Sequence, residues 1–200
     1  SVTFGNHDSE IYSTYSRDEM GDFYSREEWK NCLYQKGDQN IDGVGNSVIK
    51  VKNSNGVITQ ALFSIDTNDY PKENKLAGIV AGFTGNYDNI HENQIEWYKA
   101  SCEKLNAENK AFIEKTFDGD TKTQLLNDLG LVKSLVFMHI PPVEYADAWE
   151  EFKNNGYKDT ENVKYYYGTL GEKVCHPTDD DLFFETAVEM KSTQGIFVGH

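Results

Sequence analysis

Three short apolar runs in this chain each end in residues that can bind a metal ion. The segment Gly5-Asn6-His7-Asp8 follows the run at residues 2–4, His139 follows the run at 135–138, and His200 follows the run at 196–198. Imidazole nitrogens and amide oxygens suit Zn, Mn, Fe and Ni and do not select among them. Candidate ligands therefore occur at three distant points of the sequence.

We interpret the three runs as buried strands of a mostly parallel sheet. Strands covered on both faces read as continuous apolar runs, and ligands gather at the carboxyl ends of such strands. The sequence therefore predicts that an amide and three imidazoles meet at one edge of the sheet. The strands are expected at residues 2–4, 134–139 and 196–198.

Other segments predict a hairpin and several helices around this sheet. Residues 49–66 alternate in polarity around the turn Asn53-Ser54-Asn55-Gly56, which is typical of a β-hairpin. Helical spacing of apolar residues and cap signals predict helices at residues 25–33, 93–105, 110–117 and 121–129, after Pro142, and from an N-cap at Thr178 to Met190. Strands alternating with helices indicate an α/β fold, with a polar insertion at about residues 9–46.

The composition fits one globular domain and limits its partners. The chain has 200 residues, of which 38% are hydrophobic, and 19 basic against 33 acidic residues give a net charge of -14. This charge opposes a nucleic-acid or anionic-membrane footprint, although a bound cation could still attract a phosphate group. No apolar stretch approaches the ~20 residues of a membrane span. The three cysteines, Cys32, Cys102 and Cys175, are odd in number and far apart, so we expect free thiols and no disulfide framework.

Taken together, the three motifs resemble signature blocks of a known family. Gly-Asn-His-Asp, Phe-Met-His-Ile-Pro-Pro and the terminal Val-Gly-His are similar, in this order, to the third, fourth and fifth blocks of the calcineurin-like metallophosphoesterases, which include the purple acid phosphatases. Residues 93–98, Asn-Gln-Ile-Glu-Trp-Tyr, resemble the helix between the third and fourth blocks. The resemblance covers nearly the whole chain.

The resemblance implies a four-layer αββα sandwich with mixed sheets, of which residues 1–200 would be one partial catalytic domain without its first strands. It implies hydrolysis of phosphomonoesters or phosphodiesters by a hydroxide that two metal ions activate, with Mn, Fe and Zn not distinguished. Asn6, His139 and His200 would bind one of these ions. His7 would contact the phosphoryl group and help the leaving oxygen depart, with Asp8 orienting its ring.

The sequence departs from the family pattern at both ends. The family's Asp-x-His and Gly-Asp blocks, which supply the other metal's ligands and the bridging carboxylate, do not precede Ser1, and no second histidine follows His200. We therefore expect this chain to have little or no phosphatase activity and at most one weakly held metal ion. His91 and His176 are expected near a helix start and in a loop, without a role in the site.

Two other interpretations stay open. The region could be a phosphate- or metal-binding module, or an inactive relative of the enzymes with an interaction role. It could also be an ordinary α/β domain with scattered histidines, which the convergence of Asn6, His139 and His200 within ~4 to 5 Å would exclude. The expected partners are a small phosphate ester and a second copy that meets exposed apolar sheet edges. The sequence does not indicate a compartment.

Overall fold

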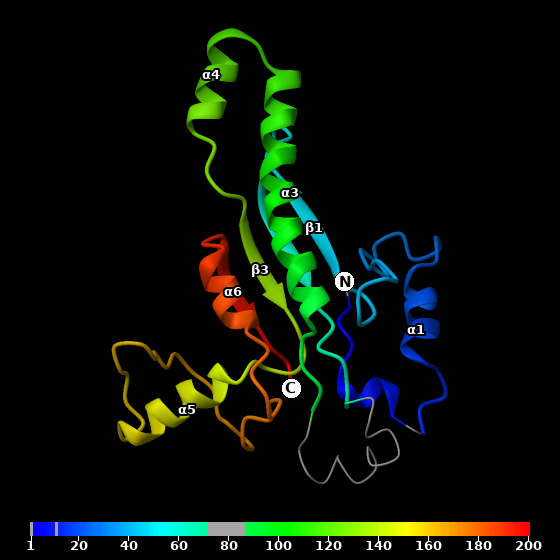
Figure 1. Cartoon of the computed structure of the whole chain (residues 1–200), viewed down its shortest axis with the longest axis vertical. Coiled ribbons are helices and arrows are strands. Elements are labelled where there is room, and N and C mark those ends of the chain that lie inside the picture. The colour runs from blue at the N-terminus through cyan, green and yellow to red at the C-terminus, as the bar shows by residue number, and fades with distance from the viewer. Residues whose placement is uncertain (1, 11, 72–86) are drawn as a thin grey trace.

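A mixed four-stranded sheet organises the chain in the computed structural model, which describes residues 2–10, 12–71 and 87–200 (Figure 1). Strands β1 and β2 are antiparallel, whereas β2, β3 and β4 run parallel. The strands are β1 (Ser47–Lys52), β2 (Ile58–Ser64), β3 (Lys133–Phe137) and β4 (Thr193–Phe197), in the spatial order β1-β2-β3-β4. The predicted α/β class is confirmed.

The helices lie before β1 and in the connections from β2 to β3 and from β3 to β4. A 3-10 helix, η1 (Asn6–Ser9), precedes α1 (Arg17–Tyr24), α3 (Glu92–Thr116), α4 (Gly119–Asn127), α5 (Glu144–Asn154) and α6 (Phe183–Glu189). Tyr98 of α3 forms the centre of the core, with its ring 4.7 Å from that of Phe63 on β2 and 5.2 Å from that of Phe183 on α6. Helices α3 and α6 therefore cover the same face of the sheet, as Figure 1 shows.

The predicted hairpin is confirmed as β1 and β2. Its turn is held by Asn53, whose side-chain oxygen accepts hydrogen bonds from the N–H groups of Asn55 and Val57, at 3.0 and 3.1 Å. Gly56 has φ +84°, and a Cβ there would lie 2.8 Å from the Phe112 ring. Glycine is therefore required at this position both by the backbone and by the helix that crosses the turn.

The two helices predicted at residues 93–105 and 110–117 form one continuous helix, α3. The buried side chain of Asn109 explains the continuity, because it forms hydrogen bonds with both backbone groups of Ile58 on β2. Its oxygen accepts a hydrogen bond from Ile58 N at 2.8 Å, and its nitrogen donates to Ile58 O at 2.7 Å. This contact fixes the C-terminal half of α3 against the sheet and offsets the weak helix propensity of asparagine.

Three sequence predictions of elements are wrong. Residues 2–4 form no strand; Phe4 is buried against the rings of Tyr24 and Tyr34, and side-chain packing replaces a hydrogen-bonded ladder. Residues 25–33 form turns, and the helix of this region is α1. Thr178 caps no helix, because α6 begins five residues later, where the Asp181 carboxylate accepts a hydrogen bond from Phe183 N at 2.9 Å.

The sheet face opposite α3 and α6 is apolar and partly exposed. Phe137 and Phe197 stack with ring centroids 5.1 Å apart and remain 37% and 50% exposed. Leu62 and Leu135 are paired on the same face and are half-buried. In the described part of the chain, no helix is long and apolar enough to cross a membrane.

Candidate metal site

Asn6 and His139 meet beside the carboxyl end of β3. Asn6 opens η1 and is 1% exposed, and its Oδ1 lies 3.0 Å from His139 Nε2. The Asn6 amide nitrogen donates a hydrogen bond to the Tyr70 hydroxyl at 3.2 Å, which directs the amide oxygen toward the imidazole. Two ligand atoms 3.0 Å apart would subtend about 90° at a shared metal ion with bonds of about 2.1 Å.

His200 lies next to His139. The two imidazole rings are 4.9 Å apart between centroids and cross at 80°. The backbone fixes this neighbourhood, because the N–H groups of Gly199 and His200 both donate to the carbonyl of His139, at 3.2 and 3.0 Å. His200 Nδ1 donates to the carbonyl of Cys175 at 3.1 Å, which leaves the Nε2 lone pair free for a ligand.

Gly5 forms one wall of the site. A Cβ built at Gly5 would lie 2.8 Å from His139 Nε2, closer than real Cβ contacts allow. The backbone of Gly5 has φ −102° and ψ 171°, an extended conformation open to any residue. The glycine is therefore required by the close approach of the imidazole.

The electrostatic surroundings keep His139 uncharged at neutral pH. Burial, followed by the neighbouring His200, lowers the pKa of His139 to about 4, and Asp8 opposes this shift. Metal ions bind the neutral imidazole, so a lowered pKa removes proton competition at neutral pH. The site thus holds a neutral imidazole against an amide oxygen, which is a suitable donor set for a divalent or trivalent ion.

Arg17 positions this site and was not identified from the sequence. Its guanidinium forms a buried ion pair with Asp66, with Nη1 2.5 Å from Oδ1, and Nη2 donates to the carbonyls of Gly5 and Asn68, both at 2.9 Å. Arg17 thereby ties the segment before η1 to the chain that leaves β2. Its helix carries a detectable signal, since Ser16 and Glu19 form a reciprocal capping box.

His7 and Asp8 occupy different surroundings from Asn6. The His7 side chain is 73% exposed, and its Nδ1 contacts the Glu10 carboxylate. Asp8 accepts a hydrogen bond from Gly5 N at 2.7 Å. In the structure, therefore, the carboxylate that contacts His7 belongs to Glu10 instead of Asp8, and Asp8 stabilises the turn that presents Asn6.

The two remaining histidines lie in other environments. His91 is the N-cap of α3, and its ring nitrogens lie 2.9 Å from Asp42 and 3.2 Å from Asp88. Burial lowers the pKa of His91, but the hydrogen bonds to the two carboxylates outweigh burial and raise it above its ordinary value. His176 donates from Nδ1 to the carbonyl of Pro177 at 2.6 Å.

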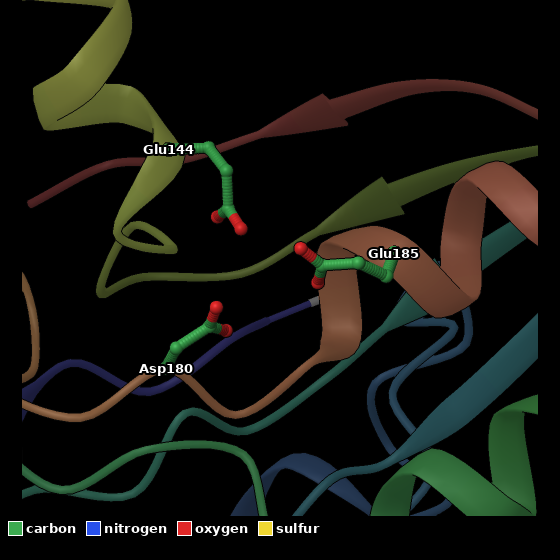
Figure 2. A group of neighbouring side chains, drawn as sticks. All are labelled: Glu144, Asp180 and Glu185. Atoms are coloured by element: carbon green, nitrogen blue, oxygen red, sulfur yellow. The ribbon is translucent and has the colours of Figure 1, made fainter.

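A separate acidic cluster lies near the starts of α5 and α6. Figure 2 shows the carboxylates of Glu144, Asp180 and Glu185 directed toward one another from three segments. One oxygen of each lies within 4.8 Å of the others, and this is the only group of three His, Cys, Asp or Glu ligands in the described residues. Because exposed acidic groups are common without a metal, the cluster alone does not define a metal site.

Comparisons with known proteins do not assign this chain to a family. No family model, no curated protein and no solved structure matches it. What the site can do follows from its own geometry. Asn6 Oδ1 contacts His139 Nε2, and the His200 ring lies beside the His139 ring, with Asn6 also bound to Tyr70 and the Tyr87 ring 4.7 Å from the His200 ring. This arrangement suits the binding of one metal ion.

Proposed function

We propose that the chain carries part of a metal-dependent phosphoesterase site, related to the calcineurin-like metallophosphoesterases, which hydrolyses phosphomonoesters or phosphodiesters. The observation that carries the proposal is the proximity of Asn6, His139 and His200. Asn6 contacts His139 although the two residues are 133 positions apart, and the His200 ring lies 4.9 Å from the His139 ring. Scattered surface or core histidines would have no reason to meet a buried asparagine at one sheet edge.

The donor atoms fit a metal ion. Asn6 offers a fixed amide oxygen, His139 offers a neutral imidazole nitrogen, and His200 keeps Nε2 free because its Nδ1 is bound to Cys175 O. A bound ion would supply Lewis acidity, which neutralises phosphate charge and lowers the pKa of a coordinated water. The exposed position of His7 on η1, beside the ligand Asn6, leaves its imidazole accessible for proton transfer to a leaving oxygen.

The uncovered sheet face supports the four-layer arrangement of this proposal. Phe137 and Phe197 form a stacked, partly exposed aromatic pair there, and a contiguous exposed apolar patch is typical of a surface that a further layer or a partner covers. In the proposed sandwich, a second sheet would pack on this face, while α3 and α6 cover the other.

A second candidate function is metal binding without hydrolysis. One observation favours it: in the described residues, no carboxylate joins His139 and His200 in a group of three close ligand atoms. Two-metal hydrolysis needs an anionic bridge that holds both ions and positions the nucleophile. The donors that lie together here accommodate one ion. Such a site would bind phosphate or stabilise a surface that interacts with a partner.

Calorimetric titration of the chain with Zn²⁺ or Mn²⁺ tests both candidates. We expect one ion per chain and a loss of affinity on the order of 100-fold in Asn6→Ala and His139→Ala. His176→Ala is the matched control, because this histidine lies in another environment. Folding of each variant is checked by circular dichroism.

A parallel assay of p-nitrophenyl phosphate turnover separates the two candidates. Metal-dependent turnover that disappears in His139→Ala supports the phosphoesterase and contradicts the binding module. Metal binding without turnover agrees with the binding module and also with a phosphoesterase site that lacks the second ion's ligands. Absence of metal binding by the folded wild-type chain would contradict both.

A further inference from the structure

The imidazole of His91 connects two carboxylates from separate segments of the chain. Its Nδ1 lies 2.9 Å from Asp42 Oδ2, in the loop before β1, and its Nε2 lies 3.2 Å from Asp88 Oδ1, in the segment before α3. A neutral imidazole carries a single N–H, so it can donate a hydrogen bond to only one of them. Both contacts therefore require the protonated ring, and loss of its proton releases one carboxylate.

The surroundings of His91 favour the protonated ring on balance. Burial lowers the pKa of His91, but the hydrogen bonds to Asp42 and Asp88 outweigh burial and raise it above its ordinary value. His91 also lines a cavity of about 580 Å³ between α3 and α6, together with the charged residues Glu92, Glu96, Lys99 and Asp181. The acidic members of this set counter the positive end of the α3 dipole, which opposes a cation at the N-cap. The cavity is large enough for water, so the ring can exchange its proton with the solvent.

Asp88 also connects the start of α3 to the residues around the candidate metal site. Its N–H donates to the carbonyl of Asp69 at 3.2 Å, in the segment after β2. The Asp69 side chain accepts a hydrogen bond from the Ser9 hydroxyl of η1 at 2.8 Å. The two aspartates thereby hold the short helix that presents Asn6.

The sequence neighbours of these two aspartates, Tyr70 and Tyr87, contact the candidate ligands directly. Their rings stack with centroids 5.9 Å apart. The Tyr70 hydroxyl accepts a hydrogen bond from Asn6, and the Tyr87 ring lies 4.7 Å from the His200 ring. A continuous series of contacts therefore leads from the start of α3 to two of the candidate ligands.

We propose that protonated His91 holds the candidate metal site in its binding arrangement, and that the site binds a metal ion more weakly once His91 has lost its proton. This regulation rests on the metal binding proposed above. Asp88 is the carboxylate that is released, because its contact with the ring is the longer one. Its Oδ1 also accepts a hydrogen bond from the adjacent Asn89 N–H at 3.0 Å, which holds it to no other element. Asp42, in contrast, is bound in addition by Asn93 of α3 at 3.3 Å.

Release of Asp88 weakens metal binding by loosening the segments around the site. Tyr70 and Tyr87 lose a restraint, and the order that the fold gives to the ligands must then be supplied when the ion binds. This effect is opposite in direction to proton competition, because histidine ligands bind a metal ion more tightly as the pH rises. The two effects are separable in a variant that keeps the ligands and lacks the ionisable ring.

Calorimetric titration of the full chain with Zn²⁺ at about pH 6 and about pH 8 tests the proposal. The wild type and His91→Gln share the same candidate ligands, so proton competition cancels in the ratio of their affinities. We expect the wild type to bind about fivefold more tightly at pH 6, and the two proteins to agree within about twofold at pH 8. His176→Gln is the matched control and should equal the wild type at both pH values. A ratio that is the same at both pH values would overturn the proposal.

Asp88→Asn tests the route through this carboxylate. It should weaken Zn²⁺ binding at pH 6 as His91→Gln does, and the double variant should bind no more weakly than either single variant, because both changes remove the same contact. Additive losses would show that His91 and Asp88 act separately and would overturn the proposal.

Hydrogen exchange of the metal-free chain, followed by NMR, gives a measurement that does not depend on metal binding. Protection here is the exchange rate relative to that of an unstructured peptide at the same pH. We expect the Asp88 N–H, which donates to Asp69 O, to lose protection from pH 6 to pH 8 in the wild type and not in His91→Gln. The same protection in both proteins at both pH values would overturn the role of His91 in a chain that binds Zn²⁺. The expected loss of protection in a chain that binds no Zn²⁺ would instead contradict the proposed function, and with it the regulation of a metal site.

Discussion

The candidate metal site is organised before any ion is bound, and Asn6 shows why. Its amide nitrogen is held by Tyr70, and its amide oxygen is held by His139, so the side chain has no freedom to rotate. Neutral His139 in its Nε2–H tautomer can donate to that oxygen in the absence of metal, and in the Nδ1–H tautomer it would offer the Nε2 lone pair to an ion. The conformational entropy of these side chains is therefore lost on folding and does not have to be lost on metal binding.

Gly5 provides a prediction at this scale. In Gly5→Ala, the new methyl group would lie 2.8 Å from His139 Nε2 and displace the imidazole from Asn6. Because the backbone conformation of Gly5 is open to alanine, the effect is steric alone. We expect a loss of about 1 to 3 kcal/mol in the free energy of unfolding, measured by urea denaturation, together with weaker metal binding.

Gly130→Ala is the control for this variant. A Cβ at Gly130 meets no atom within 4 Å, so the substitution should leave both quantities unchanged. Unchanged metal binding in Gly5→Ala would show that His139 does not bind the ion in the position that the structure gives it.

The sequence identified some residues of the site and not others, for a physical reason. Asn6, His139 and His200 follow apolar runs, and the chemistry of their side chains is visible in the sequence. Arg17 and Tyr70 act on the site through contacts with residues far along the chain, and such contacts follow only from the fold. The partner of His7 also differs from the prediction, because the turn of η1 brings Glu10 to the imidazole and uses Asp8 as a cap.

At the scale of elements, local signals were reliable where they matched the packing. The hairpin was predictable because its alternation and its turn residues agree. The first part of α3 was predictable because its apolar face covers the sheet, but its continuity with the stretch predicted at residues 110–117 was not. The helix predicted at residues 25–33 failed because the capping box at Ser16 and Glu19 starts a helix earlier. The strand predicted at residues 2–4 failed because burial of Phe4 is satisfied by aromatic neighbours. Residues 77–82, Ala-Gly-Ile-Val-Ala-Gly, lack the strand-to-helix context of a phosphate-binding loop, so we interpret their glycines as backbone accommodation; they lie outside the described residues.

The start of α3 gives a prediction of pH dependence. His91 has a carboxylate at each ring nitrogen, and these two hydrogen bonds raise its pKa despite burial. A raised pKa in the folded state stabilises the fold fully below the unfolded value of about 6.5, and this contribution is lost as the pH rises through the folded value. We therefore expect the free energy of unfolding to fall from about pH 6.5 upward.

Urea denaturation of the wild type and His91→Gln across this range isolates the effect. The wild type should lose stability with rising pH, and His91→Gln should lose less, because its side chain cannot be protonated. His176→Gln should follow the wild type. A pH profile that is the same in His91→Gln and the wild type would show that Asp42 and Asp88 do not stabilise a charged His91.

The whole molecule is asymmetric about its sheet. One face carries α3 and α6 over a closed core in which Phe63 and Val136 are fully buried. The other face carries Phe137 and Phe197, which are packed on each other and remain partly exposed. The helix layer of α3 and α6 covers only the first face. The second face would be covered in the four-layer sandwich that we propose, or by a partner.

Alanine substitution on the two faces measures this asymmetry. Phe63→Ala opens a cavity in the closed core and should cost about 3 to 5 kcal/mol in the free energy of unfolding. Phe197→Ala removes a half-exposed ring and one stacking contact, so it should cost about 1 kcal/mol or less in the isolated chain. Equal costs at both positions would mean that the second face is covered in solution. Sedimentation of the same samples would then tell whether a second copy or the chain's own residues cover it, since only a second copy raises the mass.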